Sequence, residues 1–196
     1  MLTLQFDQNA LKDKNRFELL ITDENELSGL PESARDAAAM LAKSKDKNGW
    51  LFNLSAPSYI PFMRYSDKRD LREKMYREYM SVGNKGDEFD NKDIIKKIVN
   101  IRLEIAQLMG FKNYAEYALE HTMAKNSANV YKLLNQLLEA YKPIAINEYN
   151  AVEGFALGTE KENITVMPWD WSYYSEKLRD CLLYTSPSPR DLSTSR

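Results

Sequence analysis

The sequence predicts an all-α fold with at most a small two-stranded β ribbon. Of the 196 residues, 43% are hydrophobic and 29% charged, with only 7 glycines and 7 prolines, a composition typical of a helix-rich globular chain. Apolar residues recur at helical spacing in several long stretches, most clearly between Asp93 and Met109. The best strand candidate is Gly49–Leu54, which lies between turn residues and carries β-favouring side chains.

The N-terminal stretch predicts a helix, a turn and a second helix. Apolar residues recur at loosely helical spacing at Leu2, Phe6, Leu11 and Phe17. A convincing N-cap does not precede them, so we expect the chain to begin inside an element. Gly29 and Pro31 are turn signals, and Ala34–Lys45 reads as a helix with a small apolar face.

The next stretch contains the predicted ribbon. We expect Gly49–Leu54 to pair with Leu19–Thr22. Residues 56–66 (APSYIPFMRYS) predict a turn or a short helix, and Asp67–Met80 predicts a longer one. Acidic and basic residues alternate at its start, which indicates a salt-bridged helix surface and not a phosphate site. Residues 82–91 predict an exposed loop.

The clearest helix has one apolar stripe, made of Ile94, Ile98, Ile101, Ile105 and Leu108. Gly110 is its expected C-cap, and Asn113 with Glu116 is the polar pair expected to start the helix Tyr114–Glu120.

The helix expected to follow Ser127 has an apolar set predicted to face inward: Val130, Leu133, Leu134, Leu137, Leu138 and Tyr141. Pro143 should kink this helix without ending it. Gly154, Gly158 and the polar TEKEN stretch predict a loop, and residues 169–180 (WDWSYYSEKLRD) predict the start of a further helix.

The bulk properties exclude several functional classes. The net charge of −2 and pI near 5.6 give no basic footprint for nucleic acid or for an anionic membrane surface. One cysteine cannot form an internal disulfide, and the sequence holds neither a signal-peptide core nor a run of about 20 apolar residues. We therefore expect a cytoplasmic protein without nucleic-acid or membrane partners.

The sequence shows no self-sufficient active site. His121 is its only histidine, whereas a zinc site needs three or four ligands, and an H-E-x-x-H motif needs two histidines. Glu116 and Glu120 lie one helical turn apart, which is typical of a solvated face. The acidic loop 87–93 lacks the glycine and terminal glutamate of an EF-hand. We therefore assign no catalytic, cofactor-binding or metal-ligating residue.

Five segments, taken together, resemble the thimet-oligopeptidase-like zinc metallopeptidases. This family includes peptidyl-dipeptidase and oligopeptidase A, and the likeness is greatest to the peptidyl-dipeptidase branch. The segments occur in the family's order and at about its spacing; they are ELSGLPES (26–33), LSAPSYIPFMRYSDKRDLREKMY (54–76), DNKDIIKKIVNIRLEIAQLMGFKNYAEYAL (90–119), TMAKN (122–126) and MPWDWSYYSEKLR (167–179).

The resemblance implies a helical fragment of a larger, clam-shaped zinc peptidase domain. The intact enzyme would hydrolyse short peptides, either as an oligopeptidase or by releasing C-terminal dipeptides. Its H-E-x-x-H helix would supply two histidine ligands to zinc, and the zinc ion would polarise the scissile carbonyl and activate water. Those catalytic parts lie downstream of the matched segments, so this stretch would be channel-wall scaffold, inactive and zinc-free without its missing C-terminal catalytic half.

The last sixteen residues interrupt the resemblance. Residues 181–191 (CLLYTSPSPRD) can be encoded by a nucleotide string that resembles a transposon-end adapter used in DNA sequencing libraries. We therefore expect residues 1–180 to be a helical scaffold segment truncated at both ends, with exposed apolar patches, and residues 181–196 to be a non-native tail. A native disordered tail is the alternative, because Ser/Pro/Thr tracts are ordinary linkers.

Two other functions remain open at this level. The chain could be a free-standing all-α module that binds peptides or proteins without catalysis. It could also be a small hydrolase that uses Glu116 and Glu120 or His121, for which the sequence gives little support.

Overall fold

The computed structural model describes residues 1–160 and 164–185. Over these residues the chain forms helices and one two-stranded sheet, which confirms the predicted all-α class with a small ribbon. The chain divides into two compact units. The first unit comprises Met1–Asp13 and Val82–Glu148, and the second comprises Lys14–Ser81 and the chain from Tyr149 onward. None of the described helices is long and apolar enough to cross a membrane.

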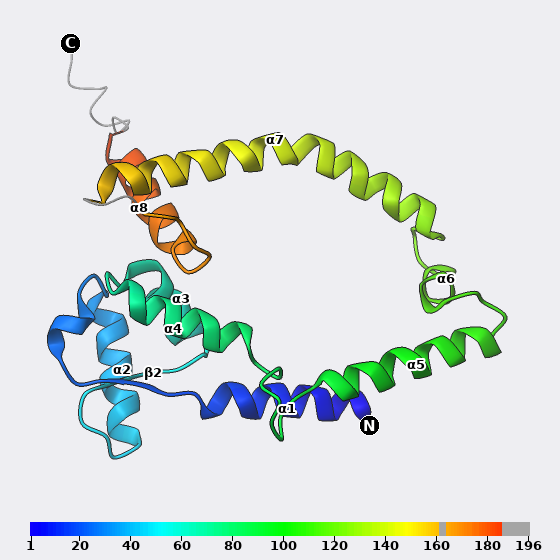
Figure 1. The fold of residues 1–196 in the computed structure, drawn as a ribbon, viewed down its shortest axis with the longest axis horizontal. Helices are drawn as coiled ribbons and strands as arrows, with labels where there is room; N and C mark the ends of the chain where they lie inside the picture. Colours follow the sequence, from blue (N-terminus) through cyan, green and yellow to red (C-terminus); the bar gives the residue numbers. More distant parts are fainter. Residues whose placement is uncertain (161–163, 186–196) are drawn as a thin grey trace, which may run out of the picture. The chain divides into compact units, whose positions relative to one another are not determined.

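The ribbon lies in the second unit. Strands β1 (Leu19–Ile21) and β2 (Trp50–Phe52) pair antiparallel, with Leu19 opposite Phe52, so the predicted pairing is confirmed. Helix α2 (Glu32–Ser44) packs against β2 (Figure 1) and begins two residues before the predicted start, directly after Pro31. The short 3₁₀ helix η1 (Glu24–Leu27), which was not predicted, begins where the Asp23 carboxylate accepts the amide hydrogen of Asn25.

Helices α3 (Ala56–Tyr65) and α4 (Arg69–Met80) complete this part of the unit. Residues 56–65 form ten helical residues, the helix alternative of the two predicted, even though they contain two prolines. Pro57 lies in the first turn, where its missing N–H has no helical acceptor, so only Pro61 costs the helix a hydrogen bond. Helix α8 (Trp171–Thr185) packs against α3 (Figure 1).

Helix α8 extends past the predicted junction of scaffold and tail. Residues 181–185 of the predicted tail are helical. The rest of that tail, residues 186–196, lies outside the described residues, as does most of the predicted TEKEN loop, residues 161–163.

In the first unit, the connection 82–91 is anchored at both ends to helix α1 (Leu2–Arg16). The buried Asp13 carboxylate accepts the amide hydrogen of Gly83 at 2.8 Å. At the other end, the buried Asn91 side chain donates to the Phe6 carbonyl at 3.0 Å and accepts from Asn9 at 3.1 Å. Only the middle of this stretch is exposed, so the predicted exposed loop is wrong at its two ends.

Helices α5 (Lys92–Leu108) and α6 (Tyr114–Leu119) follow as predicted. Gly110 has a φ of +83°, the left-handed conformation expected just after a helix C-terminus. The Asn113 side chain accepts the amide hydrogen of Glu116 and donates to its carboxylate, so the predicted polar pair at the start of α6 is confirmed.

Helix α7 (Ser127–Thr159) is longer than the sequence predicts. It passes through Pro143 without ending, as expected, but it also continues through Gly154 and Gly158, where a loop was predicted. The reason is tertiary packing: Val152 and Ala156 are buried against α8, in a core cluster with Tyr173 and Tyr174, which outweighs about 1 kcal/mol of helix propensity per glycine.

Large apolar side chains on α5 and α7 remain exposed. The face of α7 predicted to point inward is wrong for five of its six members, which are exposed in the structure: Leu133, Leu134, Leu137, Leu138 and Tyr141. On α5, Ile94 is buried, but Ile101, Ile105 and Leu108 of the same stripe are exposed, Leu108 by 87%. This agrees with the expectation that some helix faces of the chain expose apolar patches.

Candidate functional site

The residues considered for chemistry on sequence grounds have surface and capping roles. His121 is exposed, and its Nε2 lies 3.7 Å from a carboxylate oxygen of Glu120. The Glu116 carboxylate accepts a hydrogen bond from the Asn113 side chain at the start of α6. The Glu116 contact belongs to the N-terminal cap of α6, and the exposed Glu120–His121 pair lies just beyond its last residue.

The acidic loop before α5 caps the helix. The Asp90 carboxylate accepts the amide hydrogens of Gly86 at 2.6 Å and Lys92 at 2.9 Å, and Asp87 accepts that of Phe89. The backbone hydrogen bond from Lys92 contributes most to lowering the pKa of Asp90. Over residues 1–160 and 164–185, no three His, Cys, Asp or Glu side chains are grouped so that they could hold a metal ion.

The most elaborate polar site is centred on Asp170, at the start of α8. Its side chain has no exposed surface. Arg69 donates to it from Nε and from Nη2, the latter at 2.7 Å, and Arg72 donates from Nη2 at 2.8 Å. The amide hydrogen of Met167 adds a bond at 3.1 Å. Burial would by itself raise the pKa of the Asp170 carboxyl, but the bonds from the two arginines and the backbone bring it below its ordinary value.

Arg72 is 1% exposed and donates a hydrogen bond from each of its three guanidinium nitrogens. Besides Asp170, it donates to the Ser66 carbonyl at 2.7 Å and to the Trp169 carbonyl at 3.3 Å. Its Cζ lies 3.9 Å from the centre of the Tyr173 ring, a cation–π contact shielded from water. The buried charge is therefore paired, and each of its three nitrogens donates a hydrogen bond, which offsets the cost of burying it.

A second layer extends this Asp170 network to neighbouring elements. The Tyr173 hydroxyl donates to Asp67 at 2.7 Å, and Asp67 accepts from Ser28 at 2.6 Å. Burial, and then the bond to Asp67, raise the pKa of Tyr173 well above its usual range. The Tyr65 hydroxyl donates to Glu176 of α8 at 2.8 Å. Together these bonds fasten the start of α8 to α3, α4 and the turn at Ser28.

The sequence did not reveal this network. Its pattern predicted a salt-bridged surface for the first turn of α4, and that prediction is wrong for Arg72. The buried partner, Asp170, is 98 positions further along the chain. A single acidic residue before a helix indicates an N-cap but says nothing about which distant arginine it pairs with.

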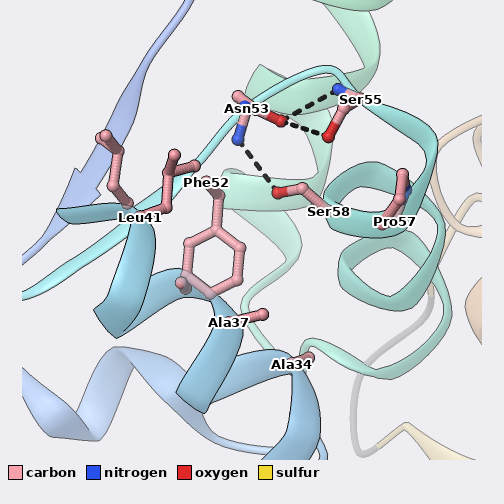
Figure 2. A pocket seen from close by; sticks show the side chains of 10 residues that line it. Ala34, Ala37, Leu41, Phe52, Asn53, Ser55, Pro57 and Ser58 are labelled. Carbon is pink, nitrogen blue, oxygen red and sulfur yellow. Dashed lines mark hydrogen bonds between the residues drawn. The ribbon is translucent and has the colours of Figure 1, made fainter. Parts of the chain in front are cut away.

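A separate apolar cavity lies between α2, β2 and the start of α3. It has a volume of about 260 Å³ and is lined by Ala34, Ala37, Ala38, Leu41, Leu51, Phe52, Asn53, Ser55, Pro57 and Ser58. Figure 2 shows its polar rim. Asn53 Oδ1 accepts hydrogen bonds from the backbone N–H and from the hydroxyl of Ser55, and Ser58 Oγ accepts the backbone amide hydrogen of Asn53. Because these polar groups bind one another, the cavity offers apolar contact and little else.

Comparison with known proteins connects these residues to an enzyme family. The sequence model of "Peptidase family M3" matches residues 62–194. Oligopeptidase A of Haemophilus influenzae is 40% identical over 187 residues, covering 92% of this chain and 27% of the relative. Probable cytosolic oligopeptidase A of Arabidopsis thaliana is 38% identical, over 91% of this chain and 26% of the relative.

A relative named for dipeptidyl carboxypeptidase activity has a lower sequence identity to this chain. Dipeptidyl carboxypeptidase of Escherichia coli is 28% identical over 91% of this chain and 26% of its own length. Identity over nearly the whole of this chain is therefore higher to the oligopeptidase A relatives, whereas the five short segments of the sequence had favoured the peptidyl-dipeptidase branch. The chain spans about a quarter of the length of these curated relatives.

Proposed function

The chain belongs to peptidase family M3, and from this premise we propose that it supplies scaffold to a zinc metallopeptidase that hydrolyses short peptides in the cytoplasm. The observation that carries the proposal is the 40% identity over nearly the whole chain to an oligopeptidase A. The greater identity to oligopeptidase A than to dipeptidyl carboxypeptidase supports an oligopeptidase over a peptidyl-dipeptidase.

The described residues do not fit the zinc ion that the family implies. Protein zinc sites use three or four nitrogen, sulfur or oxygen ligands about 2.0–2.3 Å from the metal. His121 is the only histidine in the sequence, and it is exposed beside one carboxylate of its own helix end. We therefore propose that the metal ligands and the general base belong to a part of the enzyme outside these 196 residues.

What this chain contributes, in our proposal, is a rigid wall. The Asp170 network fixes the start of α8 against α4, so the backbone that carries the surface side chains is held in one arrangement. The exposed apolar faces of α5 and α7 are suited to burial in a larger protein, because such extensive exposure is rare on a monomeric protein.

A chimera tests the proposed function. In oligopeptidase A of Haemophilus influenzae, the aligned stretch is replaced by residues 1–180 of this chain, and the zinc content and the hydrolysis of an internally quenched peptide are measured. We expect zinc binding and hydrolysis within about tenfold of the parent enzyme. A chimera that folds and binds zinc like the parent but does not hydrolyse the peptide would refute the proposal.

A further inference from the structure

An aromatic cavity lies in the second unit, away from the cavity of Figure 2. It has a volume of about 430 Å³ and is lined by Tyr76, Tyr149, Val166, Met167, Pro168 and Trp171. The Tyr149 and Trp171 rings are stacked, with centroids 5.8 Å apart and planes 8° from parallel. Tyr149 is 42% exposed and Trp171 37%, so part of this stacked pair remains open to a ligand.

One wall of the aromatic cavity is held in place by the Asp170 network. The wall is the segment Val166–Pro168. Just before it, the Thr165 carbonyl accepts a hydrogen bond from Arg69 at 2.9 Å, and within it the Met167 amide donates to the buried Asp170. The wall is therefore fixed before any ligand arrives, which lowers the entropic cost of binding.

The lining of the aromatic cavity is apolar. None of the lining side chains is charged. Charges of both signs lie outside the lining. Arg77 is paired with Glu73, and the Glu153 carboxylate accepts a hydrogen bond from the Tyr149 hydroxyl at 3.4 Å. The uncharged lining therefore offers ring stacking and apolar contact, which suit a neutral aromatic ring.

We propose that this cavity binds an aromatic side chain of a peptide, as a contact site that positions aromatic-containing substrates. The proposal rests on the peptide-hydrolase function proposed above for its choice of a peptide ligand. A phenylalanine ring can add to the Tyr149–Trp171 stack and contact Met167 and Pro168, which buries apolar surface without leaving a polar group unpaired.

Binding is tested on the full chain with N-acetyl-phenylalanine amide. The indole N–H signals of ¹⁵N-labelled protein are followed during titration, with N-acetyl-alanine amide and N-acetyl-lysine amide as comparison ligands. We expect the phenylalanine ligand to shift the Trp171 signal with an affinity at least tenfold above that of the other two. Equal affinities, or a preference for the lysine ligand, would overturn the proposal.

Variants locate the site. Trp171→Leu and Tyr149→Leu should each weaken binding at least tenfold, as judged from the remaining indole and amide signals that shift with ligand. Tyr131→Leu, at an exposed ring elsewhere on α7, is the matched control and should leave binding unchanged. Dispersed signals from Trp50 and Trp169 report that each variant is folded, and undiminished binding in both cavity variants would refute the assignment.

This experiment measures no hydrolysis, so its result is separate from that of the chimera. Aromatic binding by the chain together with an inactive chimera would refute the proposed function and leave the site standing. An active chimera built on a chain that does not distinguish phenylalanine from alanine would refute the site alone.

Discussion

The substitution Asp170→Asn removes the charge from the centre of the buried network. The side chain keeps its shape and an oxygen that can accept the Met167 amide hydrogen. Its amide nitrogen, however, is a donor placed against the arginine donors. Arg72, which is 1% exposed, then has no buried anion to balance its charge.

The magnitude follows from that burial. Breaking a buried ion pair by removing one partner costs about 3–5 kcal/mol, because the remaining charge stays out of water. Loss of the Arg69 pair adds little, since the Arg69 side chain is 43% exposed and can be solvated. Domains unfold at a total cost of about 5–15 kcal/mol, so Asp170→Asn should remove a large part of the stability of the second unit.

Urea denaturation followed by tryptophan fluorescence measures the effect. Trp50, Trp169 and Trp171 are the only tryptophans of the chain and all lie in the second unit, so the signal reports that unit alone. Glu73→Gln, which breaks the exposed pair with Arg77, is the matched control and should cost at most about 1 kcal/mol. If Asp170→Asn costs no more than this control, the reasoning about the buried charge is wrong.

Two further predictions concern the stability of the fold at low pH and the effect of replacing Gly29 or Gly86 by alanine. The pKa values of Asp67 and Asp170 are lowered in the fold, so their stabilising contribution is complete above the unfolded value of about 3.9 and is lost as the pH falls through the lowered folded values. The stability gap between wild type and Asp170→Asn should therefore shrink as the pH falls below about 4 in urea titrations, and a constant gap would contradict the shift. Gly29 has a φ of +82°, and a Cβ there would lie 2.1 Å from the Tyr65 carbonyl oxygen, so Gly29→Ala should cost about 2–5 kcal/mol by circular dichroism. Gly86→Ala, at a φ of +72° with open space around it, should cost only about 1–2 kcal/mol, and equal losses would refute the role of the clash.

The sequence predicted the elements whose signals are local. The stripe from Ile94 to Leu108 indicated α5, Asn113 and Glu116 indicated the start of α6, and turn residues bounded the strand that became β2. These signals depend on side chains within one or two turns of each other, so they are readable without the rest of the fold.

The parts that the sequence missed depend on distant packing. Gly154 and Gly158 predicted a loop because the helix-propensity cost of glycine can be read from the local sequence. The burial of Val152 and Ala156 against α8 depends on residues further along the chain, so the local sequence does not show it. Similarly, Asp170 and Arg72 are far apart in the chain, and the aromatic cavity joins Tyr76, Tyr149 and Trp171 from three helices. Nothing local indicated which of these residues would meet.

The central claim is that these 196 residues are scaffold without the metal centre of their family. It is tested most directly by measuring the zinc content of the purified chain after dialysis against zinc, together with hydrolysis of an internally quenched peptide. We predict less than about 0.1 zinc per chain and no hydrolysis above that of buffer. One zinc per chain with peptide hydrolysis that a chelator abolishes would contradict the account.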